Sequence, residues 1–340
     1  MTEKAILITG ISGFIAKQCA LDLLNHGYAV RGTVRHMSKA AEVRATLAKY
    51  CDTTKLTYVE ADLLSDAGWP AAMEGVGGVL HIASPFPTGE PKDPDELLRP
   101  AVDGTLRVLR AAVAAGVPRV VQTSSMAAVM AGHPHERMKP FDEDDWTDAD
   151  APGVTTYYRS KTLAEKAARD FVVSVGGRLH FSTVNPGLVL GPVLDKDIGT
   201  SAEVIQMFLR GKYPGTPRIY LTVVDVRDVA KMHRLALESI EPSGGRYLAV
   251  SEALRFLDIA LPIRRALGRA ARRVPSRELP DFLVRLLALF DPTARMILPD
   301  LGFEFQVDNS RTRHALKMEF IPVTESAPAM ASSLIELGLV

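Results

Sequence analysis

The sequence predicts an α/β fold, a doubly wound parallel sheet with a smaller C-terminal lobe. Short apolar runs alternate with helical patterns through the first two thirds of the chain, which is the order of elements in a doubly wound sheet. Most of these runs are apolar throughout rather than alternating, as in central strands that are covered on both faces. A glycine-rich turn, ITGISGFIA at residues 8–16, ends the first run. The carboxyl ends of the strands should therefore share one edge, where ligands bind.

Seven segments have the length and apolar content of buried strands: Ala5–Thr9, Ala29–Val34, Leu56–Glu60, Gly78–Ile82, Arg119–Thr123, His180–Asn185 and Arg246–Val250. Five segments between them have a helical pattern: Phe14–His26, Lys39–Lys49, Asp95–Ala115, Thr155–Val175 and Asp228–Leu237. From about Pro186 the pattern loosens, because proline, glycine and arginine become common. Helices expected at Leu254–Leu267 and Asp281–Phe290 have no strand between them.

We therefore expect two domains. Residues 1–185, with strand and helix segments at about 222–250, would form a dinucleotide-binding domain, and residues 186–221 and 251–340 a substrate-binding lobe. The segment 281–290 is interpreted either as a contact surface or as part of the core. A run of arginines in the lobe is interpreted as a solvated helix face, with anion binding as the alternative: Arg264, Arg265, Arg269, Arg272 and Arg273.

The composition argues against several classes of protein. Of 340 residues, 47% are apolar and 24% charged, and 40 basic residues balance 40 acidic ones, so no overall field attracts nucleic acid or an acidic membrane. Cys19 and Cys51 predict no disulfide framework and have no metal-site spacing with histidine. We find no signal peptide, and the apolar run from Phe282 to Phe290 is short and interrupted by Arg285. The expectation is a cytoplasmic protein without a metal, nucleic-acid or membrane partner.

The glycine turn has the spacing of a nucleotide site. Gly10 would make the tight turn, Gly13 would let the backbone approach a pyrophosphate, and Ala16 would let helix and strand pack closely. The helix that follows presents free N–H groups and a positive dipole end to phosphates. The alternative is a turn that serves packing alone.

The second strand indicates which nucleotide would bind. An NAD site usually has Asp or Glu at the end of this strand, but the segment reads YAVRGTVRH, and Arg35 stands in that place. A guanidinium suits a 2′-phosphate, which favours NADP(H), although a solvent-facing arginine is the plainer interpretation. Asp62 follows the third strand and would either meet the adenine or cap a turn.

A phenol, an ammonium and a hydroxyl converge on the same edge. Tyr157 and Lys161 lie four residues apart on the inward stripe of one helix, while Tyr158, Thr162, Glu165 and Arg169 form its opposite, polar face. Ser124 and Ser125 follow the fifth strand. A nearby ammonium would lower the phenol pKa toward neutrality, and a serine hydroxyl would hold a substrate oxygen. We therefore predict reduction of a carbonyl group.

These segments together resemble the extended short-chain dehydrogenase/reductases, within the group of dihydroflavonol, cinnamoyl-CoA and yeast-type methylglyoxal (carbonyl) reductases. The similarity covers nearly the whole chain and lies in ITGISGFIA, TVR, LHIASPF, PAVDGTLRVLRAA, TSSMAAV, YYRSKTLAEKAA, NPGLVLGP and VDVRDVAKMH. It implies a Rossmann fold that binds NADP.

The resemblance also implies roles for particular residues. Tyr157 would be the proton donor, Lys161 its activator and a ribose ligand, Ser125 the oxyanion partner, and Arg35 the phosphate ligand. The implied cofactor-binding set is Gly10, Ser12, Gly13, Phe14, Ile15, Arg35, Asp62, Leu63, Ala83, Ser84, Tyr157, Lys161, Pro186 and Leu188.

One departure bears on the substrate. Plant dihydroflavonol reductases have a substrate-reading asparagine where this chain has Met130, and a thioether cannot hydrogen-bond flavonoid hydroxyls as an amide does. Phe86, Met126, Met130 and Leu188 would instead line an apolar pocket for a hydrophobic or aryl carbonyl, or would simply be core.

Other functions stay open on the sequence alone. An NAD-dependent nucleotide-sugar epimerase or dehydratase and a hydroxysteroid dehydrogenase share the fold, and a non-catalytic NADP-binding redox sensor is an alternative of another class. The intact set Ser125, Tyr157 and Lys161 argues against the sensor. The physiological substrate, stereochemistry and direction are open, and so is the choice between monomer and homodimer.

Overall fold

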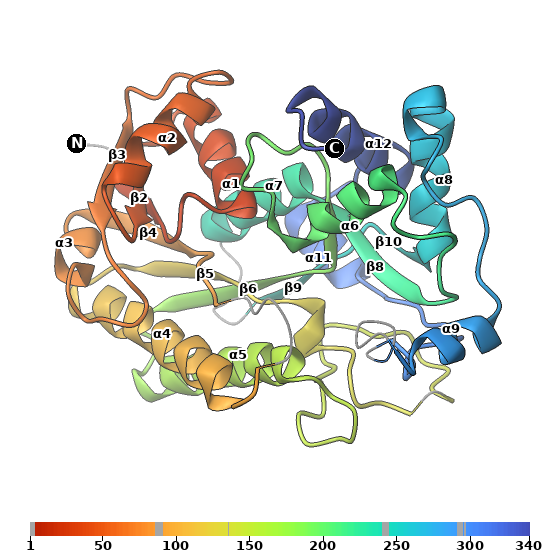
Figure 1. Cartoon of the computed structure of the whole chain (residues 1–340). Coiled ribbons are helices and arrows are strands. Elements are labelled where there is room, and N and C mark those ends of the chain that lie inside the picture. Colours follow the sequence, from red (N-terminus) through yellow and green to blue (C-terminus); the bar gives the residue numbers. More distant parts are fainter. Residues whose placement is uncertain (1–3, 86–90, 135, 240–244, 291–294, 296) are drawn as a thin grey trace.

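A seven-stranded parallel sheet forms the centre of the computed structural model (Figure 1), which describes residues 4–85, 91–134, 136–239, 245–290, 295 and 297–340. The strand order is β3-β2-β1-β4-β5-β6-β9. The strands are β1 (Ala5–Ile8), β2 (Val30–Val34), β3 (Leu56–Glu60), β4 (Val76–His81), β5 (Arg119–Thr123), β6 (His180–Pro186) and β9 (Arg246–Ala249). The predicted doubly wound fold and all seven predicted strands are confirmed.

Helices cover both faces of this sheet, and each face has its own core (Figure 1). On one face lie α1 (Phe14–Asn25), α2 (Ser38–Leu47) and α7 (Val226–Glu238). On the other face lie α3 (Trp69–Met73), α4 (Asp95–Ala114) and α5 (Thr156–Ser174). Because α5 runs along the face next to β5 and β6, its first turns lie at the carboxyl edge of the sheet.

A second, three-stranded sheet lies in the C-terminal lobe and was not predicted. Its strands are β7 (Leu188–Leu190), β8 (Tyr220–Asp225) and β10 (Glu252–Arg255), in the order β10-β8-β7. The helix expected at 254–267 begins two residues later, at Phe256, because residues 254 and 255 end β10. The strands of this small sheet are short, and their paired residues lie 29 to 35 positions apart along the chain, so no local pattern reveals them.

The lobe and the main sheet are interleaved along the chain. Within the segment at about 222–250, β8 pairs in the small sheet, α7 covers the large sheet, and β9 completes the large sheet. The division into a dinucleotide-binding domain and a substrate lobe stays a prediction. The remaining elements of the described residues are η1 (Met126–Ala128), α6 (Gly199–Arg210), α8 (Phe256–Leu267), η2 (Gly268–Ala271), α9 (Asp281–Leu287), α11 (Ser310–Leu316) and α12 (Val323–Glu336).

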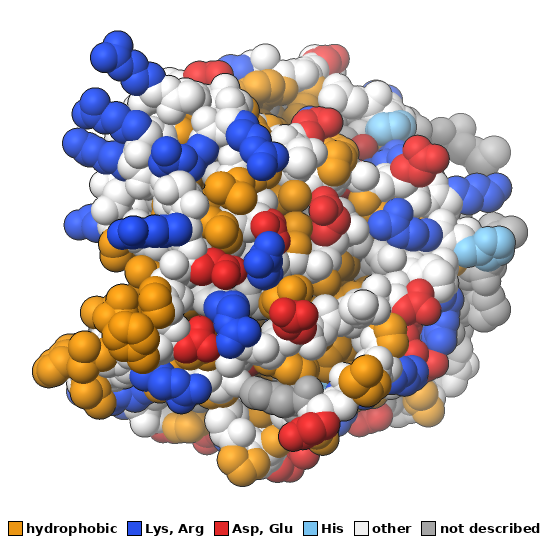
Figure 2. Space-filling model, turned by 90° about the vertical axis from the view of Figure 1, so that its right-hand side faces the viewer, with side chains coloured by type: hydrophobic (Ala, Val, Ile, Leu, Met, Phe, Trp, Pro, Cys, Tyr) orange, Lys and Arg blue, Asp and Glu red, His pale blue; other side chains and the backbone are white. Residues whose placement is uncertain are grey.

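The side of the molecule that carries α8 and α9 has both hydrophobic and basic side chains (Figure 2). Phe282, Leu286, Leu289 and Phe290 are exposed, whereas Val284 is buried. The core interpretation of 281–290 therefore fails for most of this segment. The predicted solvated face is confirmed for the arginines that are exposed, which are Arg265, Arg269, Arg272 and Arg273. No helix among the described residues is long and apolar enough to span a bilayer.

We expect Phe208→Ala to lower the free energy of unfolding by about 3–5 kcal/mol. Phe208 on α6 is fully buried, and its ring centroid lies 5.0 Å from that of Phe256 and 5.7 Å from that of Tyr213. Urea unfolding measures the change. The matched control is Phe282→Ala, since Phe282 is 67% exposed and its loss should change stability by about 0.5 kcal/mol or less. Equal losses would contradict the assignment of Phe208 to the core.

Candidate active site

The glycine turn between β1 and α1 has the predicted shape. Gly10 has φ +63°, and a Cβ there would lie 3.0 Å from the Cβ of Ala83, so both space and backbone conformation require glycine. The N–H of Gly10 donates to the Thr33 hydroxyl at 2.9 Å. Gly13 begins the helix, and the carbonyl of Gly10 is its only close neighbour among the described atoms, at 3.5 Å from an added Cβ. This side of the turn is open to a ligand, which fits the approach of a pyrophosphate.

Thr9 ties this turn to the end of β4, a role that the sequence analysis missed. Its hydroxyl accepts hydrogen bonds from the backbone N–H of Ile82 and Ala83, at 3.0 and 2.9 Å. It also lies 3.0 Å from Nδ1 of His81. Burial, with a smaller contribution from the charge of Lys161, lowers the pKa of His81 to about 3. His81 is therefore neutral near neutral pH and serves as a buried hydrogen-bonding group.

Arg35 is exposed just after β2, where the sequence places the 2′-phosphate ligand. Arg31 is occupied, because its guanidinium donates to the carbonyls of residues 71, 72 and 74. Lys39 pairs with Glu42 at 2.9 Å. Arg35 has no hydrogen bond or ion pair with any residue that the structure describes, so its side chain is available to an anion.

The other predicted cofactor residues lie along the same edge of the sheet. The Asp62 carboxylate accepts a hydrogen bond from the N–H of Leu64 at 2.9 Å, which confirms the turn-capping interpretation of Asp62. Leu63 packs beside Gly104 of α4. Binding itself stays a prediction for the whole set. Its remaining members follow β1 and β4 or lie at the end of β6 and the start of β7: Ser12, Phe14, Ile15, Ala83, Ser84, Pro186 and Leu188.

Ser125, Tyr157 and Lys161 come together, as predicted. Thr155 caps α5 by accepting from the N–H of Tyr158, and Tyr157 and Lys161 lie on the first two turns of this helix. Ser125 caps η1 directly after β5, and its side chain hydrogen-bonds the Tyr157 phenol. The ammonium of Lys161 lies 5.8 Å from the centroid of the Tyr157 ring and donates to the Ser84 hydroxyl at 3.0 Å.

The pKa of the Tyr157 phenol beside Lys161 differs from the expectation. Burial raises the pKa of Tyr157, and the hydrogen bond with Ser125 opposes this effect. The expected lowering of that pKa by Lys161 is therefore wrong for the protein alone. Burial likewise lowers the pKa of Lys161, to about 8. The physical reason is that loss of hydration penalises the charged form of each group, so the phenol stays protonated near neutral pH.

The predicted substrate residues that the structure describes divide between buried and partly exposed positions. Met126 is buried in a small cluster with Phe141, against which Met130 and Phe305 pack while partly exposed. The ring centroid of Phe305 lies 6.2 Å from that of Tyr220 and 5.7 Å from that of Phe303. The sequence analysis missed these aromatic residues, because they lie more than 40 positions from the catalytic helix. Leu188 packs on the main core, and Phe86 lies outside the described residues.

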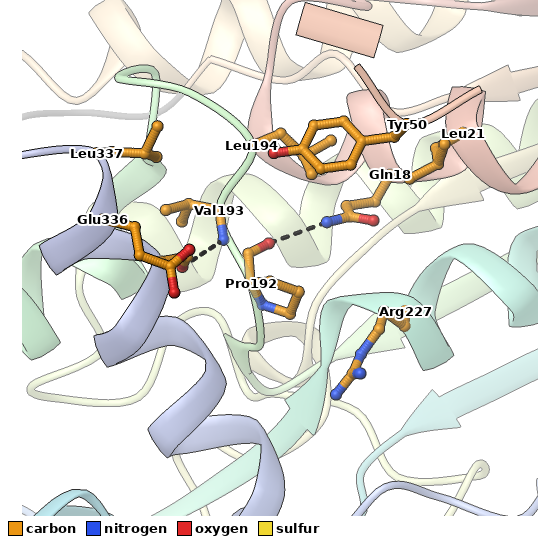
Figure 3. A pocket seen from close by; sticks show the side chains of 10 residues that line it. Gln18, Leu21, Tyr50, Pro192, Val193, Leu194, Arg227, Glu336 and Leu337 are labelled. Carbon is orange, nitrogen blue, oxygen red and sulfur yellow. Dashed lines mark hydrogen bonds between the residues drawn. The ribbon is translucent and has the colours of Figure 1, made fainter. Parts of the chain in front are cut away.

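A separate cavity of about 320 Å³ lies between α1, α12 and residues 192–194 (Figure 3). The side-chain amide of Gln18 donates to the carbonyl of Pro192 at 2.9 Å, and the N–H of Val193 donates to the Ser333 hydroxyl at 3.0 Å. None of Ser125, Tyr157 and Lys161 lines this cavity. This cavity is therefore distinct from the site that Ser125, Tyr157 and Lys161 form.

Comparison with known proteins identifies the family. A family model described as "NAD dependent epimerase/dehydratase family" matches residues 6–249, which is most of the chain. The chain belongs to this family. Within it, the protein is an extended short-chain dehydrogenase/reductase, as the resemblance implied.

Several relatives of this family member are reductases by name. The ketoreductase azaE of Aspergillus niger is 34% identical, with 98% of each chain covered. The cinnamoyl-CoA reductase CAD2 of Medicago truncatula is 36% identical over 82% of this chain and 83% of its own. The crystal structure of yeast methylglyoxal/isovaleraldehyde reductase Gre2, complexed with NADPH, superposes with a TM-score of 0.82 at 26% identity, over 99% of this chain and 100% of the other. The family consists of NAD(P)-dependent oxidoreductases.

We expect Lys161→Met to stabilise the cofactor-free protein near pH 7 by roughly 1–3 kcal/mol, because the variant removes a buried charge. The folded-state pKa of Lys161, about 8, lies below its ordinary value of 10.5. Between these values the folded state binds fewer protons than the unfolded state, so wild-type stability rises with pH relative to the variant.

Urea unfolding of both proteins near pH 7 and again near pH 10 measures this difference. The advantage of the variant should be largest below about pH 8 and should shrink toward the higher pH. An advantage that does not depend on pH would show that the Lys161 ammonium is not the source of the effect.

Proposed function

We propose that this protein is an NADPH-dependent reductase of aldehydes and ketones. The observation that carries the proposal is the hydrogen bond between Ser125 and Tyr157, next to the buried ammonium of Lys161, at the edge of the sheet where the glycine turn opens. This set provides a proton donor, an oxyanion partner and a cation beside a nucleotide-binding turn. Bound NADPH would supply the hydride that reaches the carbonyl carbon.

The chain's own residues fit such a cofactor. Gly10 and Gly13 leave the backbone of the turn accessible, and the helix N-terminus behind them favours phosphate. Arg35 has no partner among the described residues at the place where a 2′-phosphate would need one. Lys161 already donates to Ser84, and its two further N–H groups can meet ribose hydroxyls.

The protonation states support a role for Tyr157 as general acid. Burial keeps the phenol protonated, so it can donate to a carbonyl oxygen that becomes negatively charged. The Ser125 hydroxyl, which touches the phenol, is placed to hold the same oxygen. The Lys161 ammonium then favours the phenolate that remains after transfer, because an opposite charge at short range lowers the energy of an anion.

The surroundings favour a hydrophobic or aryl substrate. Met130 and Phe305 pack on the cluster that contains Met126, the residue after Ser125, and both are partly exposed, as are Tyr220 and Phe303 beside Phe305. Such side chains bind apolar groups and offer few hydrogen bonds to a sugar nucleotide. The names of the relatives, a ketoreductase, a cinnamoyl-CoA reductase and a methylglyoxal/isovaleraldehyde reductase, agree with carbonyl reduction but differ in substrate.

The direct test is to follow oxidation of NADPH, and separately of NADH, with a panel of aliphatic aldehydes, aryl aldehydes, ketones and a UDP-sugar. Oxidation of NADPH with aryl or aliphatic carbonyls is the expected result. Conversion of the UDP-sugar without net change in cofactor would instead indicate an epimerase. Tight NADP binding without any turnover would indicate a non-catalytic sensor.

We expect Tyr157→Phe to lower kcat by about 100-fold or more while the Kd for NADPH stays nearly unchanged, because only the proton donor is lost. The matched control is Tyr158→Phe, which removes the neighbouring hydroxyl on the same helix and should cost far less. Steady-state kinetics and cofactor fluorescence measure the two effects. Full activity of the Tyr157 variant would remove the general acid from the proposal.

We expect Arg35→Ala to raise the Kd for NADPH by about 10- to 100-fold, with little change for NADH, because charge-assisted hydrogen bonds to a 2′-phosphate are lost. Fluorescence titration without substrate measures both constants. Lys39→Ala is the control, since Lys39 is exposed and already pairs with Glu42. Equal losses for the two cofactors would refute the assignment of Arg35.

A further inference from the structure

The carboxylate of Glu165 is completely buried in α5, one helical turn beyond Lys161. The interpretation of Tyr158, Thr162, Glu165 and Arg169 as the polar face opposite the inward stripe is wrong, because Thr162 and Glu165 are fully buried. Such a charge is retained only with strong partners. Nearby cations, Arg246 first, and hydrogen bonds outweigh burial and lower the pKa of Glu165, so the carboxylate is ionised near neutral pH.

One oxygen of this carboxylate holds the segment that carries Ser125. Oε2 accepts a hydrogen bond from the Ser124 hydroxyl at 2.6 Å and another from the side-chain amide of Asn185 at 2.8 Å. The same amide lies 3.3 Å from the backbone carbonyl of Ser125 and donates to it. Glu165 is therefore joined to both residues between β5 and η1, directly to the Ser124 side chain and through Asn185 to the Ser125 backbone.

The other oxygen recruits Arg246, which holds the far end of the same segment. Oε1 accepts from Nε of Arg246 at 2.8 Å. The Arg246 guanidinium donates onward to the carbonyl of Ala128, the last residue of η1, at 3.0 Å and to that of Glu143 at 3.1 Å. It also stacks on the Trp146 ring at 3.8 Å from the centroid, which fixes its plane.

We propose that Glu165 and Arg246 are positioning residues for the carbonyl reduction proposed above, which set the Ser125 hydroxyl against the Tyr157 phenol. Tyr157, Lys161 and Glu165 share one helix, whose rise of about 1.5 Å per residue places Glu165 a fixed ~12 Å along the axis from Tyr157. Through Ser124, Asn185 and Ala128, that helix is bonded to the separate segment that supplies Ser125. The distance between the two catalytic hydroxyls thus depends on the buried ion pair.

Kinetics of single variants test the link. We expect Ser124→Ala, Arg246→Lys and Glu165→Gln each to lower kcat by about 10-fold or more, with the Kd for NADPH changed by about threefold or less, because orientation rather than binding is lost. Ser124→Ala removes a single hydroxyl and guards against failure of the other two variants to fold. The matched control is Arg169→Lys. Arg169 pairs with the same carboxylate but reaches Thr183 rather than the Ser125 segment, and its variant should stay within about threefold of wild type.

A double-mutant cycle separates positioning from general damage. If Glu165 and its partners act through Ser125, adding Ser124→Ala to Ser125→Ala should lower kcat no further, because the hydroxyl that needs placing is gone. Additive losses would overturn the proposal. So would losses of equal size in Arg169→Lys and Ser124→Ala.

Titration of the phenol gives a readout that needs no turnover. Tyrosinate absorbance of each protein, minus that of its Tyr157→Phe counterpart, reports Tyr157. Because the bond with Ser125 lowers the pKa of Tyr157, that pKa should rise in Ser125→Ala, Ser124→Ala and Glu165→Gln, and should stay at the wild-type value in Arg169→Lys. The charged or titratable neighbours are Lys161 and Tyr158 on the same helix, with His81 beside Lys161 and Asp300 beside Tyr158, and all remain in every variant.

The two readouts keep this proposal distinct from the proposed function. A raised phenol pKa in a protein that reduces no carbonyl would uphold the positioning link and reject the reductase. An active reductase whose phenol pKa is the same in wild type, Ser124→Ala and Glu165→Gln would keep the enzyme and overturn the positioning role of Glu165 and Arg246.

Discussion

The hydrogen bond between the Ser125 hydroxyl and the Tyr157 phenol is the contact on which the site depends. The two residues come from different elements, the end of β5 and the start of α5, so the bond exists only when the sheet and the helix are packed in one arrangement. The large sheet supplies that arrangement, because its parallel strands bring the glycine turn, the Ser84 region and Ser125 to the same edge. Fold and chemistry are thus linked at a single contact.

Burial favours the neutral form of both Tyr157 and Lys161. It keeps the Tyr157 phenol protonated and weakens the proton affinity of Lys161, so each group is held nearer its neutral form than in water. Such an environment destabilises the folded protein and strengthens every electrostatic interaction inside the site. A nearby anion would raise the proton affinity of the buried Lys161 amine strongly. A phenolate formed at Tyr157 would be such an anion.

The buried Glu165 carboxylate holds neighbouring elements of the core in a defined orientation. Its partners lie directly after β5 and on β6 and β9, which are strands at one side of the large sheet. An apolar residue of similar size could fill the same space, but it would not bond the helix to the Ser125 segment at defined points. The ion pair with Arg246 therefore provides orientation that packing alone does not.

The sequence by itself determined the seven strands of the large sheet, the alternation of strands and helices along the chain, and the spacing of Tyr157 and Lys161. These features follow from local periodicity and from local backbone conformation, such as the positive φ of Gly10, which act within a few residues. The Ser125–Tyr157 contact could be expected from the shared edge of the sheet.

Only the tertiary structure decided the small sheet, the aromatic side chains of the lobe, the partners of Thr9, and the role of Glu165. Arg246 lies 81 positions from Glu165 along the chain, and no local pattern marks that pair. The tertiary structure also reversed the expected pKa of Tyr157, because desolvation depends on what surrounds a side chain and not on its neighbours in sequence.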